Sequence, residues 1–306
     1  MAENRSKPKA YQRPAELPDL PARPADAHKG SFGTCLLVGG SHGMMGALIL
    51  AGRAATRSGV GLCRLAGPET MLPVLPAGVP EATSVALPEE QGAPSILALP
   101  TLLGVLDNVD AIGLGPGLSR QGTAGELVLS YLRRTTLPTV LDADALNALE
   151  GQPDYLDACA VPVVLTPHPG EAARLLGLPD AGAVQEDRPK AAAELARRSQ
   201  AIVVLKGAGT IVQEPEGFEG SPPPRRFVNR TGNPGMATGG TGDVLTGIIT
   251  ALLAQGLPPY EAAVLGVHAH GLAGDLAVME RGSQAGIVAG DLVEALPEVW
   301  KLLGGS

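Results

Sequence analysis

The sequence predicts an α/β protein in which a mostly parallel sheet carries helices on both faces. The main observation is a repeated order of a short apolar run, a glycine or proline turn, and a helix-patterned segment. This order is typical of parallel sheets, because each strand needs a helical crossover to reach the next one. A second observation is that each unusual polar or glycine cluster follows a predicted strand. Ligands bind beyond the carboxyl ends of the strands in such sheets, so we expect one site at that edge.

Short apolar runs give the predicted strands, which are 34–38, 59–66, 111–114, 139–141, 163–165 and 201–205. Helical segments are predicted at 47–57, from Ala145, from the Thr166–Glu171 turn through Leu176, at 244–253 and within the apolar run 262–277. The 244–253 segment has its large apolar residues on one helical face, and Gly256 and Pro258 then end it. Residues 214–226 are polar and proline-rich, so we expect a surface loop there.

Length and composition favour one large domain. The chain has 306 residues, of which 44% are hydrophobic, so it can bury a substantial core. Residues 1–26 are rich in proline and charge and are predicted to be an extended or partly disordered arm, followed by a single domain at 27–306. The arm lacks the apolar core of a secretory signal, and no uninterrupted apolar stretch is long enough to span a membrane.

Charge and cysteine content exclude several partners. The formal net charge of -8 argues against binding to nucleic acid or to an anionic membrane, and aromatic residues make up only 3% of the chain. Cys35, Cys63 and Cys159 are far apart and show no C-x-x-C spacing. They are therefore expected to be reduced core residues of a cytoplasmic protein.

The segment Asn233–Asp243 carries most of the functional information. Its glycines, Gly240 and Gly242 among them, stand directly before the predicted 244–253 helix. Exposed backbone N–H groups at a helix start form an anion site, and Asp243 would then serve as a base or orienting group beside the anion. The alternative is a glycine-rich turn in which Asp243 is an ordinary first-turn acid.

Two further glycine clusters follow strands. Gly39–Gly46 does not match G-x-G-x-x-G, and the chain contains no P-loop, so a standard dinucleotide or P-loop site is disfavoured. This cluster either cradles a ligand or permits tight strand–helix packing. In Lys206–Thr210 a lysine can reach a phosphate and a threonine can contact a nucleotide. The alternative is a hairpin turn with a solvated lysine, in which Thr210–Val212 begins the returning strand.

Histidines and an acid mark the remaining candidates. His168 and Glu171 stand at the start of a predicted helix, where both can face one cleft. Glu171 could hold Mg²⁺ directly or through water, and the alternative is a favourable acid in a first helical turn. His268 and His270 lie in an apolar helical run and are interpreted as core or supporting residues.

These residues, in this order, resemble the ADP- or ATP-dependent NAD(P)H-hydrate dehydratases. The resemblance covers the chain from His28 to Leu292 and rests on several motifs. They are GGSHGMMGALILAGRAATRSGVGL, GLGPGL, VLDADALNAL, TPHPGE, KGAGT and NPGMATGGTGDVLTGIITALLAQG. It implies a ribokinase-like, three-layer α/β/α sandwich with a mostly parallel central sheet. It also implies the stand-alone form, without the N-terminal epimerase domain of many relatives.

The resemblance assigns roles to residues of this chain. Asp243 matches the catalytic acid, and the anion hole is Gly240, Thr241 and Gly242. Nucleotide contacts fall on Lys206, Gly207, Ala208, Gly209, Thr210 and Gly242, and substrate contacts on Ala47, Gly117, His168 and Asp243. His168–Glu171 is similar to the Asn-x-x-Glu magnesium motif of sugar kinases, with histidine in place of asparagine, so the metal role of Glu171 stays open.

The implied reaction is dehydration of the S epimer of hydrated NADH or NADPH (NAD(P)HX). ADP or ATP phosphorylates the C6 hydroxyl, which makes it a good leaving group, and Mg²⁺ is the expected cofactor. The resemblance also implies a homo-oligomer, a tetramer in the family, and a separate epimerase in the same pathway. Two alternatives remain: a ribokinase-like kinase of a vitamin precursor or sugar, and a catalytically silent nucleotide-binding regulatory module.

Overall fold

The computed structural model describes residues 11–217 and 222–304. Its strands are β1 Thr34–Val38, β2 Leu62–Pro68, β3 Thr83–Leu87, β4 Glu89–Glu90, β5 Ala93–Pro94, β6 Ala111–Leu114, β7 Thr139–Leu141, β8 Val163–Leu165, β9 Ile202–Leu205, β10 Ile211–Gln213 and β11 Arg226–Val228. Its α-helices are α1 Met45–Arg57, α2 Leu75–Gly78, α3 Leu99–Gly104, α4 Ala124–Leu132, α5 Asp144–Asn147, α6 Pro169–Leu176, α7 Ala181–Glu186, α8 Arg188–Ser199, α9 Thr241–Ala254, α10 Pro259–Arg281 and α11 Ala289–Leu302. Short 3-10 helices lie at Lys29–Phe32, Glu69–Val74, Ile96–Ala98, Leu106–Asn108, Pro153–Ala158, Pro234–Met236 and Gln284–Gly286.

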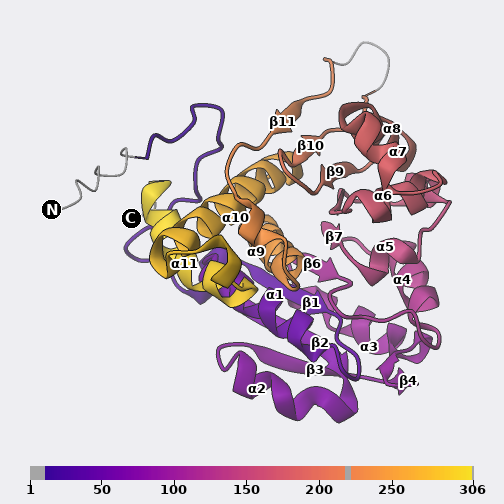
Figure 1. The fold of residues 1–306 in the computed structure, drawn as a ribbon. Coiled ribbons are helices and arrows are strands. Elements are labelled where there is room, and N and C mark those ends of the chain that lie inside the picture. The colour runs from indigo at the N-terminus through magenta and orange to yellow at the C-terminus, as the bar shows by residue number, and fades with distance from the viewer. Residues whose placement is uncertain (1–10, 218–221, 305–306) are drawn as a thin grey trace, which may run out of the picture.

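A nine-stranded sheet forms the middle of the molecule, in the order β11-β10-β9-β8-β7-β6-β1-β2-β3 (Figure 1). The seven strands from β9 to β3 are parallel, and the antiparallel pairs of this sheet lie at one end, where the reversed strand β10 pairs with β9 and with β11. The predicted mostly parallel sheet is therefore confirmed. The chain leaves β1 in one direction to β2 and β3, and continues on its other side with β6. The topological switch point, where open α/β sheets bind ligands, consequently lies between β1 and β6.

Alternating side chains divide the sheet into two faces. Cys35 and Leu37 of β1 belong to one apolar core, and Leu36 and Val38 belong to the other. Helices α1, α2, α9, α10 and α11 cover the first face, and α3 to α8 cover the second. Strands with both faces covered are apolar along their buried length, which is why residues 35–38 of β1 and all of β9 are uninterrupted hydrophobic runs. The predicted three-layer α/β/α arrangement is confirmed.

The first layer is held together by a close crossing of α1 and α9. Gly247, in the middle of α9, lies against the backbone of Ala51 in α1. A Cβ added at Gly247 would stand 2.1 Å from the Ala51 carbonyl oxygen. Only glycine allows this approach, so α9 is drawn tightly against the helix that follows β1. The packing fixes the N-terminal end of α9 beside the carboxyl edge of the sheet.

The described part of the N-terminal segment, residues 11–28, forms no helix or strand and lies on the first layer. Leu17 is 4% exposed and joins the core of that layer. The Tyr11 hydroxyl lies 2.8 Å from Nε2 of the buried His268. His268 is thus a core residue, in agreement with its interpretation from the sequence.

Several predicted boundaries were wrong. The second strand was expected to begin at Gly59 but begins at Leu62, and the first helix begins at Met45 rather than Ala47. The surface loop predicted at 214–226 ends one residue early, because Arg226 pairs with Gln213 in the sheet; residues 218–221 of that loop lie outside the described residues. Among the described residues, one helix, α10, is long and apolar enough to cross a membrane, although the sequence predicted no such segment. Of its apolar window, 72% is buried within the molecule, as in a core helix.

Candidate active site

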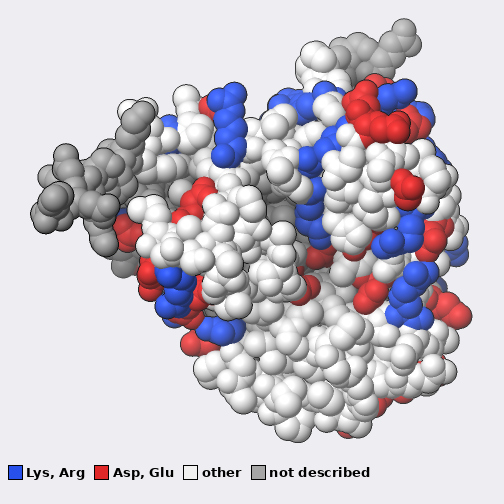
Figure 2. Space-filling view, viewed as in Figure 1, with Lys and Arg blue, Asp and Glu red and all other residues white. Residues whose placement is uncertain are grey.

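A cleft of about 890 Å³ opens at the carboxyl edge of the sheet. Its walls come from segments that are distant in the sequence: the residues that follow β7 and β8, the β9–β10 turn, the segment from β11 to the start of α9, and the middle of α10. Figure 2 shows this side of the molecule hollowed, with basic side chains along one wall and acidic ones deeper in the hollow. The lining residues include Asp142, His168, Glu171, Lys206–Thr210, Asn229–Asn233, Thr238–Asp243 and His270. The cleft therefore brings together most of the residues predicted from the sequence.

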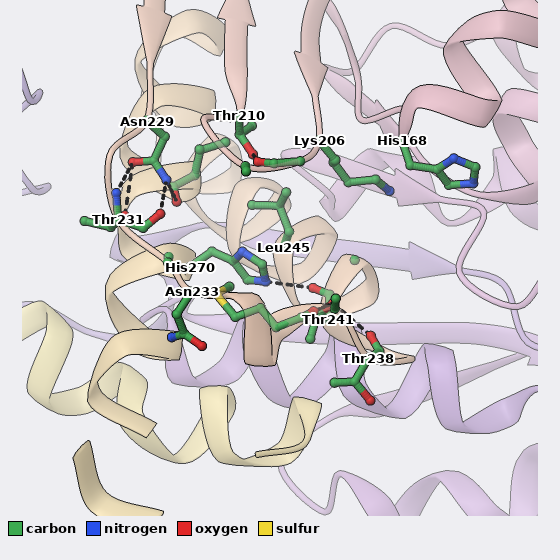
Figure 3. A pocket seen from close by; sticks show the side chains of 18 of the residues that line it. His168, Lys206, Thr210, Asn229, Thr231, Asn233, Thr238, Thr241, Leu245 and His270 are labelled. Atoms are coloured by element: carbon green, nitrogen blue, oxygen red, sulfur yellow. Dashed lines mark hydrogen bonds between the residues drawn. The ribbon is translucent and has the colours of Figure 1, made fainter. Parts of the chain in front are cut away.

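The first turn of α9 forms one wall of the cleft. Gly240 adopts a left-handed backbone conformation (φ 91°) and caps the helix without a side chain. The Thr241 hydroxyl lies 3.1 Å from the carbonyl oxygens of Met236 and Thr238, to which it donates. His270 donates from Nε2 to the Thr241 carbonyl over 2.8 Å (Figure 3). The helix start is thus braced from α10, while its first backbone N–H groups have no acceptor within the helix and face the cleft.

His270 is neutral in this position. Burial, ahead of the Thr241 hydrogen bond that opposes it, lowers the pKa of His270 to about 4. A carbonyl can only accept, so the neutral ring carries its proton on Nε2. His270 was interpreted as a core or supporting residue, and its contact with the backbone at the start of α9 agrees with that interpretation.

Asp243 lies in the first turn of α9, partly shielded from solvent. Burial, followed by the charge of Asp142, raises the pKa of Asp243 to about 7, although Lys206 acts in the opposite direction. A carboxyl group that releases its proton near neutral pH is suited to act as a general base.

Lys206 lies between acidic groups rather than in solvent. Its Nζ is 2.7 Å from Oδ1 of Asp142 and 3.8 Å from Oε2 of Glu171. Burial disfavours the charged ammonium, but Asp142, Glu171 and Asp243 outweigh it and raise the pKa of Lys206. A Cβ added at Gly242 would stand 3.3 Å from this Nζ. The ammonium group therefore stands directly in front of the α9 first turn.

His168 and Glu171 form a reciprocal cap on α6. His168 Nδ1 accepts from the N–H groups of Gly170 (3.0 Å) and Glu171 (3.2 Å), and Glu171 Oε2 accepts from the His168 N–H (2.8 Å). Because Nδ1 accepts, the neutral His168 ring carries its proton on Nε2, on a half-exposed side chain at the cleft. Burial, ahead of the charges of Lys206 and Arg174, lowers the pKa of His168. The helix-start alternative for Glu171 is thus realised, and the remaining N–H of the His168 ring, on Nε2, lies 3.4 Å from Glu171 Oε1 at the cleft.

The Lys206–Thr210 segment is the turn of the β9–β10 hairpin. The hairpin alternative weighed from the sequence is therefore correct, but its lysine is ion-paired rather than solvated. The guanidinium of Arg188, at the start of α8, donates to the carbonyl oxygens of Leu205 (3.1 Å), Lys206 (3.3 Å) and Ala208. These bonds hold the turn in one shape at the rim of the cleft.

Ala47 and Gly117 do not line the cleft but meet each other at the switch point. A Cβ added at Gly117 would stand 3.1 Å from the Ala47 Cβ and 2.4 Å from the Met44 carbonyl oxygen. One turn further along α1, Leu50 contacts Gly240, whose added Cβ would lie 2.6 Å from Leu50 Cδ1. The loop before α9 therefore lies between the Ala47–Gly117 contact on one side and the cleft on the other.

The acidic residues fit a magnesium ion that arrives with phosphates better than one held by protein alone. Within the described residues, no group of three or more metal-binding side chains surrounds a common point. The Lys206 ammonium stands beside both nearby carboxylates, and one oxygen of Glu171 is already bound to the His168 N–H. Magnesium commonly keeps its waters and uses one or two carboxylates plus substrate phosphates. Burial raises the pKa of Glu171 to about 7, and a nearby cation would reverse that shift.

The sequence did not single out Asp142 or Arg188. Asp142 follows strand β7 directly, and a carboxylate at the carboxyl end of a buried strand is the signal that could have found it. Arg188 gives no such signal, because it begins a surface helix and reaches the hairpin turn only in the fold. The residue between Asp142 and α5, Ala143, has a left-handed φ of 49°, which is a strained conformation of the kind found at functional sites.

Comparison with known proteins places these features in one family. The family model described as NAD(P)H-hydrate dehydratase matches residues 35–298. The ADP-dependent (S)-NAD(P)H-hydrate dehydratase of Neisseria meningitidis is 40% identical over 280 residues, which cover 90% of this chain and 87% of that protein. The bifunctional NAD(P)H-hydrate repair enzyme of Moorella thermoacetica is 48% identical over 285 residues, or 93% of this chain and 52% of that enzyme. The chain thus spans about half the length of the bifunctional relatives.

Solved structures agree. The ADP/ATP-dependent NAD(P)H-hydrate dehydratase from Bacillus subtilis, co-crystallized with ATP and Mg²⁺, superposes with a TM-score of 0.79 at 33% identity, covering 93% of this chain and 95% of that one. The similarity extends to a protein of the ribokinase-like superfamily, which confirms the ribokinase-like fold. With its sheet order, its cleft and the match over residues 35–298, the chain belongs to the NAD(P)H-hydrate dehydratase family.

Proposed function

We propose that this chain catalyses the ADP- or ATP-dependent dehydration of the S epimer of hydrated NADH or NADPH. The observation that carries the proposal is the position of Asp243. Its carboxylate stands in the first turn of α9, in one cleft with the Lys206 ammonium and the backbone N–H groups of that turn. A base, a cation and an anion site at one point are the parts needed to transfer a phosphoryl group to a hydroxyl.

The proposed reaction has two stages. First, the C6 hydroxyl oxygen of the hydrated ring attacks the terminal phosphorus of the nucleotide, the bond to the leaving oxygen breaks, and Asp243 accepts the hydroxyl proton. Second, the lone pair of the ring nitrogen expels the phosphate, and loss of the C5 proton restores the dihydropyridine. Hydroxide leaves poorly and phosphate leaves well, so phosphorylation lowers the barrier to the second stage. The backbone N–H groups of Thr241 and Gly242 are placed to bind the transferred group.

The two substrates are assigned to opposite sides of the loop before α9. The nucleotide is assigned to the cleft, against Lys206–Thr210 and Gly242, where Figure 3 shows the Lys206 side chain across the cleft from Thr241. The hydrated dinucleotide is assigned to Ala47 and Gly117 outside the cleft, and to His168, which lines the cleft beside the nucleotide. Asp243 is assigned to the junction, because it stands in the first turn of α9, directly after that loop, and lines the cleft.

Magnesium is proposed as the cofactor, carried by the nucleotide phosphates and approached by Glu171 directly or through water. When bound, it would neutralise charge on the transferred phosphoryl group. We also propose that the protein is cytoplasmic, forms a homo-oligomer, and works beside a separate epimerase that supplies the S epimer from the R epimer.

The deciding assay mixes purified protein, Mg²⁺, hydrated NADH and either ADP or ATP, and follows absorbance of the dihydronicotinamide ring. Recovery of the band with one nucleotide supports the proposal, and no recovery with either contradicts it. Phosphorylation of a sugar or vitamin precursor instead would identify a kinase, and nucleotide binding without turnover a regulatory module. Asp243→Asn is the matched variant, because it preserves size and removes the base. It should bind nucleotide normally and lose turnover.

A further inference from the structure

We propose that Asp142 is a positioning residue that holds the Lys206 ammonium group in front of the first turn of α9, with Thr246 holding Asp142 in turn. The inference rests on the proposed function, in which Lys206 faces the phosphates. Three secondary-structure elements supply the array. Asp142 follows β7, Lys206 follows β9, and Thr246 stands on the second turn of α9.

Both oxygens of the Asp142 carboxylate are occupied. Oδ1 lies 2.7 Å from Lys206 Nζ, and Oδ2 accepts from the Thr246 hydroxyl over 2.8 Å. Asp142 is 1% exposed and Thr246 is fully buried, so neither group exchanges these partners for water. The carboxylate is thus fixed from the helix whose N-terminus is the proposed anion site.

Lysine needs such a partner to be placed accurately. Its ammonium group sits on a flexible four-carbon stem, and ordering that stem costs rotamer entropy. Glu171 is less able to supply the order, because its nearer oxygen stands 3.8 Å from Nζ and already accepts from the His168 N–H. Asp142 makes the shorter contact, and within residues 11–217 and 222–304 its ion pair with Lys206 is the only one it forms. Lys206 Nζ is then held where a Cβ at Gly242 would nearly touch it.

If Asp142 acts through Lys206, the activity lost on replacing Asp142 should depend on whether Lys206 is present. Asp142→Asn keeps the shape of the side chain and removes the charge that orients the lysine. We expect it to raise the nucleotide KM and to lower kcat by about 100-fold, the cost of a misplacement near 1 Å. When Lys206→Met is already present, Asp142→Asn should cost little more. Losses that multiply across the two substitutions would overturn the inference.

Thermal unfolding gives a second readout that is independent of turnover. In the wild-type background, Asp142→Asn leaves the largely buried Lys206 ammonium without its nearest counter-charge and should lower Tm. In the Lys206→Met background, the same substitution removes an unpaired buried carboxylate and should raise Tm. A fall in Tm in both backgrounds would assign Asp142 to folding alone and contradict the inference.

Asp144→Asn is the control. Asp144 lies two positions away and accepts from the Ser119 N–H and from Asn147 Nδ2 rather than from Lys206. The fold-losses in activity caused by Asp144→Asn and by Lys206→Met should multiply when both substitutions are combined. ADP and ATP affinity is also measured by calorimetry for the wild type, Asp142→Asn, Lys206→Met and the variant that carries both substitutions. If the wild type restores no NADH, the proposed dehydration fails. The inference then stands only if Asp142 and Lys206 are still coupled in nucleotide binding, and it falls if their binding losses multiply.

Discussion

Replacing the proposed base should make the protein more stable at alkaline pH. The pKa of Asp243 is raised from 3.8 to about 7, first by burial and then by Asp142. In the folded protein this carboxyl holds its proton up to about pH 7, while in the unfolded chain it loses the proton near pH 4. The stability that protonation contributes is complete below about pH 4 and is lost as pH rises through 7. At pH 8 the wild type therefore folds around a carboxylate that would be more stable in water.

The structure sets the size of the effect. About three pH units at about 1.4 kcal/mol each give a ceiling of ~4 kcal/mol for Asp243→Asn at pH 8. The cleft is open to solvent, and screening there should reduce the gain to ~2 kcal/mol. For a domain of this size, that corresponds to a rise in Tm of roughly 4 °C. By the same reasoning, less than about half of the gain should remain at pH 5.

Calorimetric unfolding of wild type and Asp243→Asn at pH 5 and pH 8 measures the effect. Asp144→Asn is again the control, and it should lose stability at both pH values because the Ser119 N–H loses a charged acceptor. A gain for Asp243→Asn that is equal at both pH values, or larger at pH 5, would refute the reasoning. Burial would then not be what shifts the titration of Asp243.

Three further outcomes are expected. Gly247→Ala should destabilise the protein by ~1–3 kcal/mol, because the new Cβ would stand 2.1 Å from the Ala51 carbonyl oxygen. Gly290→Ala is the control and should not destabilise it, because there is open space at that Cβ. Chemical denaturation measures both changes. Arg188→Met should raise the nucleotide KM more than it lowers kcat, because it frees the Lys206–Thr210 turn. Arg188→Lys should restore only part of the loss. Equal effects of Arg188→Met on KM and kcat would contradict this prediction. Removing Mg²⁺ with a chelator should abolish turnover. It should leave Tm nearly unchanged, because the described residues contain no metal-binding cluster. A large fall in Tm would instead indicate a structural ion.

The sheet was largely predictable because its parallel strands are buried on both faces. β1, β6, β7 and β8 appear in the sequence as apolar runs with the observed bounds, and each is followed by a polar or glycine turn. Elements without that signal were not predicted. β11 is a three-residue edge strand beside a proline-rich loop, and α11 contains Pro297, which the sequence presents as a helix breaker.

The site was predictable only where one segment carries it. Gly240–Asp243 places the proposed anion-binding turn and the acid within four residues, so the local pattern was enough to single out this wall of the cleft. Asp142 and Lys206 are 64 residues apart, and their contact exists only because β7 and β9 end at the same edge of the sheet. The strand order that produces this contact follows from packing along the whole chain and is not encoded near either residue.

The two apolar cores on opposite faces of the sheet have a consequence for how the protein can change. They share no side chain, because each strand sends alternate residues to one core or the other. Substitutions in different cores should therefore act independently, and their free energies should add. A loss among α3–α8 can then be offset by an unrelated gain among α1 and α9–α11. Laboratory evolution for heat resistance could improve each half separately and combine the products without retesting every pair.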